Sequence, residues 1–268
     1  GTTKVPVKAN ITKRQIIVRN SKFSHQASAA CKLGKLFVAA AISAAAVVPA
    51  QAAIIDFEKL LGPVGHNQTM LEEGYRLTGW ANLLTAVETD LVGAVLDGSD
   101  LETCVSRTCP TNNTTHYYAG LNDGLLSVQS PGVVGTVKLS SFQASYIGDN
   151  ALSYPSVAGL IRVQGWRPNG TSLSQTFNLA GPTTGSFKFA QFTMASAFAT
   201  TSFAEIAFFG FTCAASGSCS AFSTDRGQFA LDNLNVTAMV DLPEPATGLL
   251  LGLGLIGVAA SARRRRQA

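Results

Sequence analysis

The chain has 268 residues and a formal net charge of +4, but this total hides an uneven distribution. Eight of the 20 Lys and Arg residues lie in residues 1–52 and four more form a run at 263–266, so residues 53–262 carry eight basic against 16 acidic side chains, a net charge of about −8. A phosphate backbone would repel a segment of this charge, which argues against nucleic acid as a partner. That segment is long enough to form one domain with its own core.

An export signal is predicted near the start of the chain. Lys32 and Lys35 precede an uncharged apolar run at 36–48, which Pro49 ends. A small-x-small sequence follows and suits signal peptidase. The residues of the predicted cleavage site are Ala50, Ala52 and Ala53. This order predicts a signal peptide at 32–52, cut before Ala53.

Residues 1–31, which include Cys31, precede this signal as an N-terminal extension. Signal peptides normally begin at the N-terminus of a chain. We therefore expect translation to start near Leu33, so that the extension is a mis-assigned start.

Residues 53–240 show the period-two alternation of β-strands, bounded by Gly, Pro and Asn. The alternation in 133–147 slips at Ser140-Ser141, which predicts a bulge. Residues 161–179 predict a hairpin that turns at 167–170. Only 83–96 is ambiguous, because it reads either as a short helix or as two strands. The pattern predicts an all-β antiparallel sandwich of the jelly-roll type.

The four cysteines after Cys31 form two local pairs. An even count in an exported chain favours disulfides, for which three connectivities exist. We favour Cys104–Cys109 and Cys213–Cys219, each of which closes a short loop. The alternative is a zinc site with four cysteine ligands, but the second pair is spaced more widely than is usual for zinc.

Known catalytic patterns are missing from the sequence: it has no GxSxG, P-loop or His-based metal motif. Glu72-Glu73 is an acidic pair, but neighbours on a strand face opposite ways, which makes it a poor glycosidase pair. We expect no catalytic residues and a non-enzymatic protein, with a glycan-active hydrolase as a weaker alternative.

The C-terminus combines three elements in a fixed order. Pro243, Glu244 and Pro245 precede an uncharged, mostly apolar run at 246–262, which is just long enough to span a bilayer core. Four arginines follow and favour a cytoplasmic location for the tail. They are Arg263, Arg264, Arg265 and Arg266. The run therefore predicts a transmembrane helix, with the domain on the outside.

This arrangement resembles the PEP-CTERM sorting signal at 241–268. The resemblance implies that exosortase, a membrane enzyme of Gram-negative bacteria, recognises Pro-Glu-Pro and removes the helix. The protein would then cross the inner membrane, be anchored there transiently, and reach the cell surface or medium. Members of the family occur in bacteria that make exopolysaccharide and grow as biofilm, so the resemblance implies exopolysaccharide as a partner. The alternative is a permanent single-pass anchor.

Gln228, Phe229 and Asp232 resemble the motif of a QFxxD subgroup of PEP-CTERM proteins. The opening residues 54–58 and closing residues 229–236 also look like the first and last strands of carbohydrate-binding jelly rolls, some of which hold calcium. That likeness implies that Asp56 or Glu58 shares Ca²⁺ with Asp232, since carboxylates suit this ion. Alternatively, Asp232-Asn233 caps a turn. A carbohydrate-binding module is accordingly the second functional expectation.

Overall fold

The computed structural model describes residues 51–240, apart from Leu84, 101–103, 105–106, 132–134 and 150–152. The N-terminal extension, nearly all of the predicted signal peptide and the sorting signal at 241–268 lie outside the described residues. Among the residues that are described, no helix is long and apolar enough to cross a membrane. The predicted transmembrane helix at 246–262 also lies outside them.

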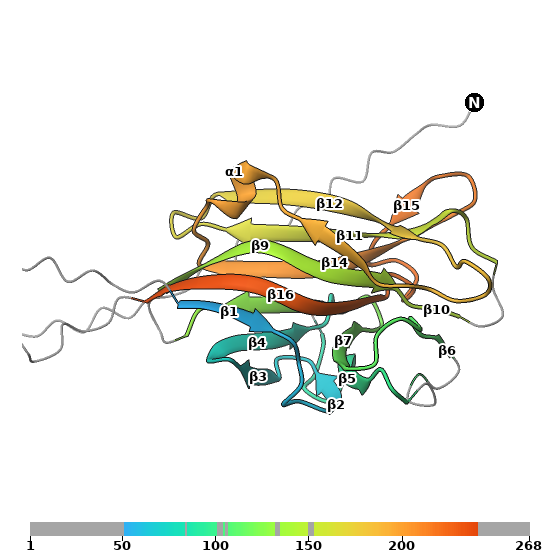
Figure 1. Cartoon of the computed structure of the whole chain (residues 1–268), viewed down its shortest axis with the longest axis horizontal. Helices are drawn as coiled ribbons and strands as arrows, with labels where there is room; N and C mark the ends of the chain where they lie inside the picture. The colour runs from blue at the N-terminus through green and yellow to red at the C-terminus, as the bar shows by residue number, and fades with distance from the viewer. Residues whose placement is uncertain are drawn as a thin grey trace, which may run out of the picture. The chain divides into compact units, whose positions relative to one another are not determined.

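Two antiparallel seven-stranded sheets make up most of the described part of the chain (Figure 1). Sheet A has the order β13-β9-β16-β7-β5-β2, and β1 pairs with the second half of β16. Its strands are β1 (Gln51–Ile55), β2 (Gly62–Gly65), β5 (Leu91–Asp97), β7 (His116–Gly120), β9 (Gly135–Tyr146), β13 (Ala190–Thr193) and β16 (Phe229–Val240). The first and last strands of the domain therefore lie side by side.

Sheet B has the order β12-β11-β14-β8-β4-β3, and β15 pairs with β14. Its strands are β3 (Thr69–Glu72), β4 (Tyr75–Trp80), β8 (Leu125–Gln129), β11 (Val157–Trp166), β12 (Ser172–Ala180), β14 (Glu205–Cys213) and β15 (Cys219–Ser220). A two-stranded pair of β6 (Arg107–Thr108) and β10 (Gly148–Asp149) and one helical turn, α1 (Ser196–Ala199), complete the described elements. The predicted all-β antiparallel sandwich is confirmed.

Strand β9 shows how the alternating sequence builds the core. Val137 and Leu139 point into the sandwich, and so do Phe142 and Ala144. The inward-facing positions thus change from odd-numbered to even-numbered residues along the strand. The change occurs where β9 pairs with Asn235 of β16, and the register there shifts by one residue. The bulge predicted at Ser140-Ser141 is therefore confirmed, and it keeps the apolar residues on both sides of it in the core.

The predicted hairpin is also present as β11 and β12, whose register runs from Trp166 opposite Ser172 to Gly159 opposite Leu179. Gly170 closes the turn with a backbone φ of 80°, which glycine adopts without a Cβ clash. The ambiguous segment at 83–96 contains no helix among its described residues and only one strand, β5. Both readings of that segment were wrong, because 85–90 forms turns.

Aromatic rings fill the space between the two sheets. Phe142 from sheet A contacts Phe177 and Phe208 from sheet B and Phe192 from β13, with ring centroids 5.4–5.5 Å apart. A smaller cluster lies on the opposite face of sheet A and contains Tyr117, Ile147, Phe189 and the Cys104–Cys109 pair. The alternation of β7 explains this division, since Tyr118 faces the main core and Tyr117 faces the second cluster.

Candidate functional site

The three residues of the QFxxD motif are all buried at the beginning of β16. Gln228 is 1% exposed, and Phe229 and Asp232 are fully buried. The ring of Phe229 packs near Tyr118, and a Cβ placed on Gly120 would lie 2.4 Å from it. The amide of Gln228 donates a hydrogen bond to the Asp225 carbonyl, 3.0 Å away. The motif therefore packs the last strand into the domain and offers no exposed surface to a ligand.

Asp232 is a buried carboxylate with three hydrogen bonds. It accepts from the Asn113 side chain at 2.7 Å, from the Asn233 backbone at 2.7 Å and from the Asn233 side chain at 3.1 Å. Burial raises the pKa of Asp232 to about 6, these hydrogen bonds oppose the shift, and the nearby charges of Glu58 and Asp56 add to it. The alternative that Asp232-Asn233 caps a turn accounts for the two hydrogen bonds from Asn233. It does not account for Glu58 and Asp56, whose charges raise the pKa of Asp232.

The other two predicted calcium ligands follow β1. Asp56 accepts from the Glu58 backbone at 3.3 Å, and Glu58 accepts from the His116 backbone at 2.9 Å. Phe57, between them, has a φ of 61°, a strained conformation for a bulky residue. No group of three or more His, Cys, Asp or Glu side chains within the described ranges is arranged to hold a metal ion. The trio is therefore adjacent but does not form a coordination shell.

Glu72, at the end of edge strand β3, is a member of this acidic region that the sequence analysis did not identify. Its side chain is 1% exposed, and neither carboxylate oxygen has a hydrogen-bond donor. Burial raises the pKa of Glu72, and the adjacent carboxylate of Asp56 raises it further. A buried carboxylate without a donor is costly, and a proton shared with Asp56 or a bound cation would lower that cost.

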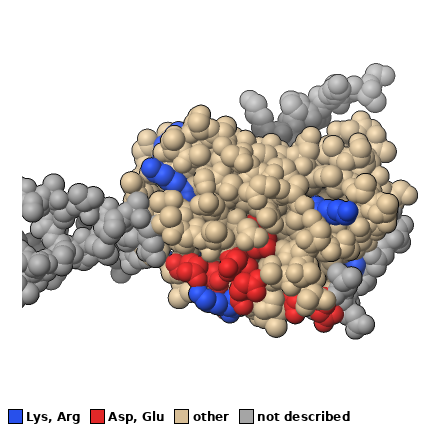
Figure 2. Space-filling model, in the orientation of Figure 1, with Lys and Arg blue, Asp and Glu red and all other residues tan. Residues whose placement is uncertain are grey.

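Asp56, Glu58, Glu72 and Asp232 are called the acidic cluster below. Figure 2 shows acidic side chains gathered on one part of the visible surface, next to a basic one. The exposed Lys59 forms an ion pair with Glu73, just outside the cluster, and the charges of Glu72 and Asp56 also act on it. The sequence signal for Glu72 was weak, because only the pairing of β3 with β4 turns its side chain inward.

Both favoured cysteine pairings are present. Cys104 is bonded to Cys109, and the Tyr117 hydroxyl donates to the Cys109 sulfur at 2.8 Å. Cys213 is bonded to Cys219, across paired positions of β14 and β15. Two separate cysteine pairs do not form the four-ligand zinc site, so that alternative does not apply to this structure.

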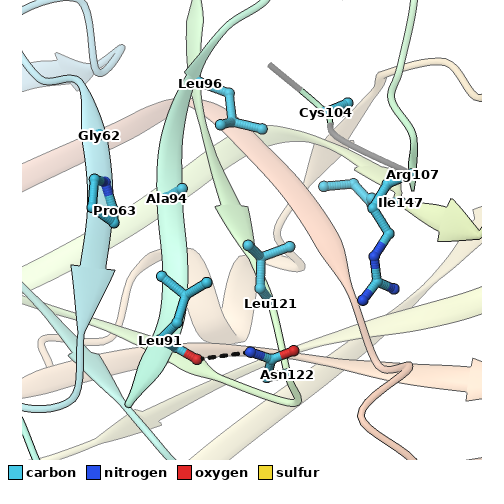
Figure 3. Close-up of a pocket in the computed structure, with 10 residues that line it drawn as sticks. All are labelled: Gly62, Pro63, Leu91, Ala94, Leu96, Cys104, Arg107, Leu121, Asn122 and Ile147. Carbon is cyan, nitrogen blue, oxygen red and sulfur yellow. Dashed lines mark hydrogen bonds between the residues drawn. The ribbon is translucent and has the colours of Figure 1, made fainter. Parts of the chain in front are cut away.

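A cavity of about 460 Å³ lies on the side of sheet A away from the main core (Figure 3). Aliphatic side chains dominate its wall, among them Leu91, Leu96, Leu121 and Ile147. Its charged lining residue, Arg107, is paired with Asp149. Among the described residues, the lining contains no carboxylate pair and no aromatic ring.

The outer face of sheet B, by contrast, carries aromatic rings. Phe209 and Phe211 of β14 point away from the core, and Phe222 from the following loop stacks on Phe209 with centroids 5.2 Å apart. Trp80 of β4 lies on the same face and donates its indole N–H to Ser127 at 3.1 Å. A sheet face that exposes parts of several rings is suited to flat, partly apolar ligands.

A comparison with known protein families matches the PEP-CTERM protein-sorting motif to residues 241–266. The predicted sorting signal is therefore confirmed as a motif of this family. Comparison with curated proteins finds no match.

Several solved structures resemble the fold. TmCBM61 in complex with β-1,4-galactotriose is 12% identical, with a TM-score of 0.31 over 68% of this chain and 92% of that chain. A DUF4465 family protein from Bacteroides ovatus is 7% identical, with a TM-score of 0.37 over 70% and 99%. CBM27-1 of Caldicellulosiruptor saccharolyticus, in complex with mannohexaose, is 14% identical, with a TM-score of 0.33 over 70% and 96%. Likenesses of this degree carry no information on the ligand of this chain.

Proposed function

We propose that this protein is an exported, non-enzymatic surface protein of a Gram-negative bacterium, which signal peptidase and exosortase process in turn. The observation that carries this proposal is the sorting motif at 241–266, which directly follows the last residue of β16. A sandwich domain ending in such a motif is the arrangement expected of a secreted domain that is held at the membrane only until its anchor is removed.

The pairing of β1 with β16 gives this processing an order. Ala52 lies opposite Thr237 and Ala53 opposite Val236, so the predicted signal-peptidase bond lies inside a paired strand. A protease needs an extended, accessible segment, which a strand within a sheet does not provide. Signal cleavage therefore precedes the docking of β1 on β16, and after cleavage β1 retains Ala53, Ile54 and Ile55.

The test is the intact mass of the protein recovered from the cell surface and the medium, before and after reduction. We expect a chain that begins at Ala53, ends near Pro245 and gains about 4 Da when the two disulfides are reduced. A mass that retains 246–268 would make the protein a permanently anchored one and would overturn the exosortase proposal.

The final location that we propose is the extracellular polysaccharide matrix or biofilm. The composition supports this, because a Ser- and Thr-rich domain with a net negative charge suits a hydrated setting. Co-recovery with the host's exopolysaccharide tests the location. If the processed protein were found entirely free in the medium, this part of the proposal would fail while the sorting proposal would stand.

We further propose that the acidic cluster binds a structural calcium ion, for which its carboxylates would have to move from their present positions into a coordination shell. Both carboxylate oxygens of Glu72 lack a hydrogen-bond partner and are therefore open to a cation. Carboxylate oxygens are the ligands that calcium prefers. Glu58, Asp56 and Asp232 would supply further oxygens, with carbonyls and water for the remainder. A melting temperature that is the same in EDTA and in CaCl₂ would exclude this ion.

The second candidate function is that of a carbohydrate-binding module. The observation that favours it is the aromatic outer face of sheet B, since ligand sites combine apolar or aromatic surface with a few placed polar groups. A glycan-active hydrolase, the weakest of the three expectations, lacks such support. Affinity electrophoresis in gels that contain the host's polysaccharide separates binding from a purely structural role.

A further inference from the structure

A row of side chains crosses the outer face of sheet B. Strand pairing places Arg162 of β11 between Phe209 of β14 and Thr176 of β12. The same row continues through Leu125 of β8 to Trp80 of β4. Residues opposite one another on neighbouring antiparallel strands have Cβ atoms about 5 Å apart, so these side chains are neighbours.

The guanidinium of Arg162 is held in place on this row. It lies 4.9 Å from the ring centroid of Phe211 and 5.9 Å from that of Phe209. Its Nε donates to the Thr176 hydroxyl at 3.0 Å. Stacking on an aromatic face and one hydrogen bond fix the plane of the group, and its terminal N–H donors remain available for a ligand.

Arg162 has no carboxylate partner within the described residues. The ion pairs found there involve Lys59, Arg107 and Arg226 instead. An arginine that is fixed in place but lacks a counterion is suited to a carboxylate, which it binds through two parallel hydrogen bonds.

The charge around this face is mixed. Residues 126–224 hold four basic and two acidic side chains, but Glu205 lies on the same strand as Phe209, and Asp123 and Asp225 line a pocket together with Phe222. In sheet B, four strand steps separate β11 from β3, or roughly 19 Å at about 4.8 Å a step. The Debye length at physiological ionic strength is about 8 Å, so the charge of the acidic cluster is largely screened at Arg162.

We propose that this face binds a polysaccharide chain that carries carboxylate groups, such as a polyuronate. Arg162 would bind a carboxylate, and the partly exposed rings of Phe211 and Phe222 would contact the apolar faces of neighbouring sugar rings. Gln164, two residues from Arg162 along β11 and on the same face, is a further hydrogen-bonding group for hydroxyls. This inference rests on the proposed association with polysaccharide and names its chemical class.

The test is native affinity electrophoresis of the exported protein, produced from the full chain and recovered in its processed form. The gels contain alginate, which carries carboxylates, or dextran, which is neutral. We expect retardation by alginate at least tenfold stronger than by dextran. R162Q should lose most of it, R162K should lose part because it keeps the charge but not the planar fork, and F211A should weaken it several-fold.

Arg76→Gln is the matched control. Arg76 is exposed on the outer face of the same sheet, at β4, and R76Q removes the same charge. Equal losses in R76Q and R162Q, or equal retardation by dextran and alginate, would overturn the inference. So would equal retardation by poly-glutamate, which would assign the face to carboxylates on peptides. If R162Q were still recovered with the host polysaccharide, only the site would be wrong; if the wild type were not recovered with it, the proposed association would fail as well.

Discussion

The two parts of the sandwich differ in composition, although both contribute to one hydrophobic core. Residues 53–125 contain ten of the 16 acidic side chains and only Phe57 among the phenylalanines, whereas residues 126–224 contain two acidic side chains and eleven of the 15 phenylalanines. The first part includes three of the four acids of the acidic cluster, and the second supplies the aromatic core around Phe142. Charged groups respond to pH and to cations, while packed rings do not. The effects of substitutions in the two parts should therefore depend differently on pH and on cations.

The largest expected effect comes from the aromatic part. Phe142→Ala removes a fully buried ring that contacts three other rings. We expect the free energy of unfolding to fall by about 3–5 kcal/mol, by an equal amount in EDTA and in CaCl₂. Urea denaturation measures both. F211A, on the outer face, is the control, with an expected cost of about 1 kcal/mol or less. A loss in F142A that calcium restores would show that the two parts are not independent.

The second effect concerns the pH dependence that Asp232 confers. Its folded pKa, about 6, lies above the value of about 3.9 in an unfolded chain. The native state therefore binds its proton more tightly, so the contribution to stability is full below about pH 4 and is lost as the pH rises through 6. In EDTA, we expect the wild type to lose on the order of 2 kcal/mol relative to D232N between pH 4 and 7.

Chemical denaturation at several pH values measures this difference. Calcium, by stabilising the charged carboxylate, should reduce it. D225N is the control, because Asp225 lies in an exposed turn. If D232N and the wild type kept the same stability difference across this pH range, Asp232 would have no raised pKa in the folded state.

Sequence alone predicted much of the aromatic part and little of the acidic one. The alternation around Phe142 and the turn at Gly170 are local signals, and each determined a strand or a hairpin. Glu72 gave no such signal, because its burial depends on the pairing of β3 with β4 and on the approach of Asp56, 16 residues earlier in the sequence. Asp232 and Glu58 were proposed together only through a family resemblance. The row of Arg162 was also missed, since it depends on the register of strands distant in the sequence.

Glu72→Gln tests the acidic part directly, through the free energy of unfolding with and without calcium. In EDTA at pH 7 it replaces a buried carboxylate that has no donor, and its amide offers a hydrogen bond to Asp56, so we expect a gain of about 1–3 kcal/mol. In CaCl₂ the same change removes a ligand and should abolish the stabilisation by calcium. Glu73→Gln is the matched control, since its ion pair with Lys59 is exposed and should contribute less than about 1 kcal/mol. Identical behaviour of the two variants would rule out a special role for Glu72.

Tyr146→Phe, in the second part of the sandwich, should have the smallest effect on the free energy of unfolding. The hydroxyl of Tyr146 donates to the Arg226 carbonyl at 2.7 Å and lies 3.1 Å from the Thr212 hydroxyl, which ties β9 to the residues before β16. Its loss should cost about 1 kcal/mol, the usual net contribution of one buried hydrogen bond. Burial raises the pKa of Tyr146 to about 12, so the hydroxyl stays neutral throughout pH 4–9. The cost of Y146F, measured by urea denaturation, should therefore be constant over that range and the same with or without calcium. A cost that varied with pH as that of D232N does would mean that the acidic cluster acts on the whole sandwich.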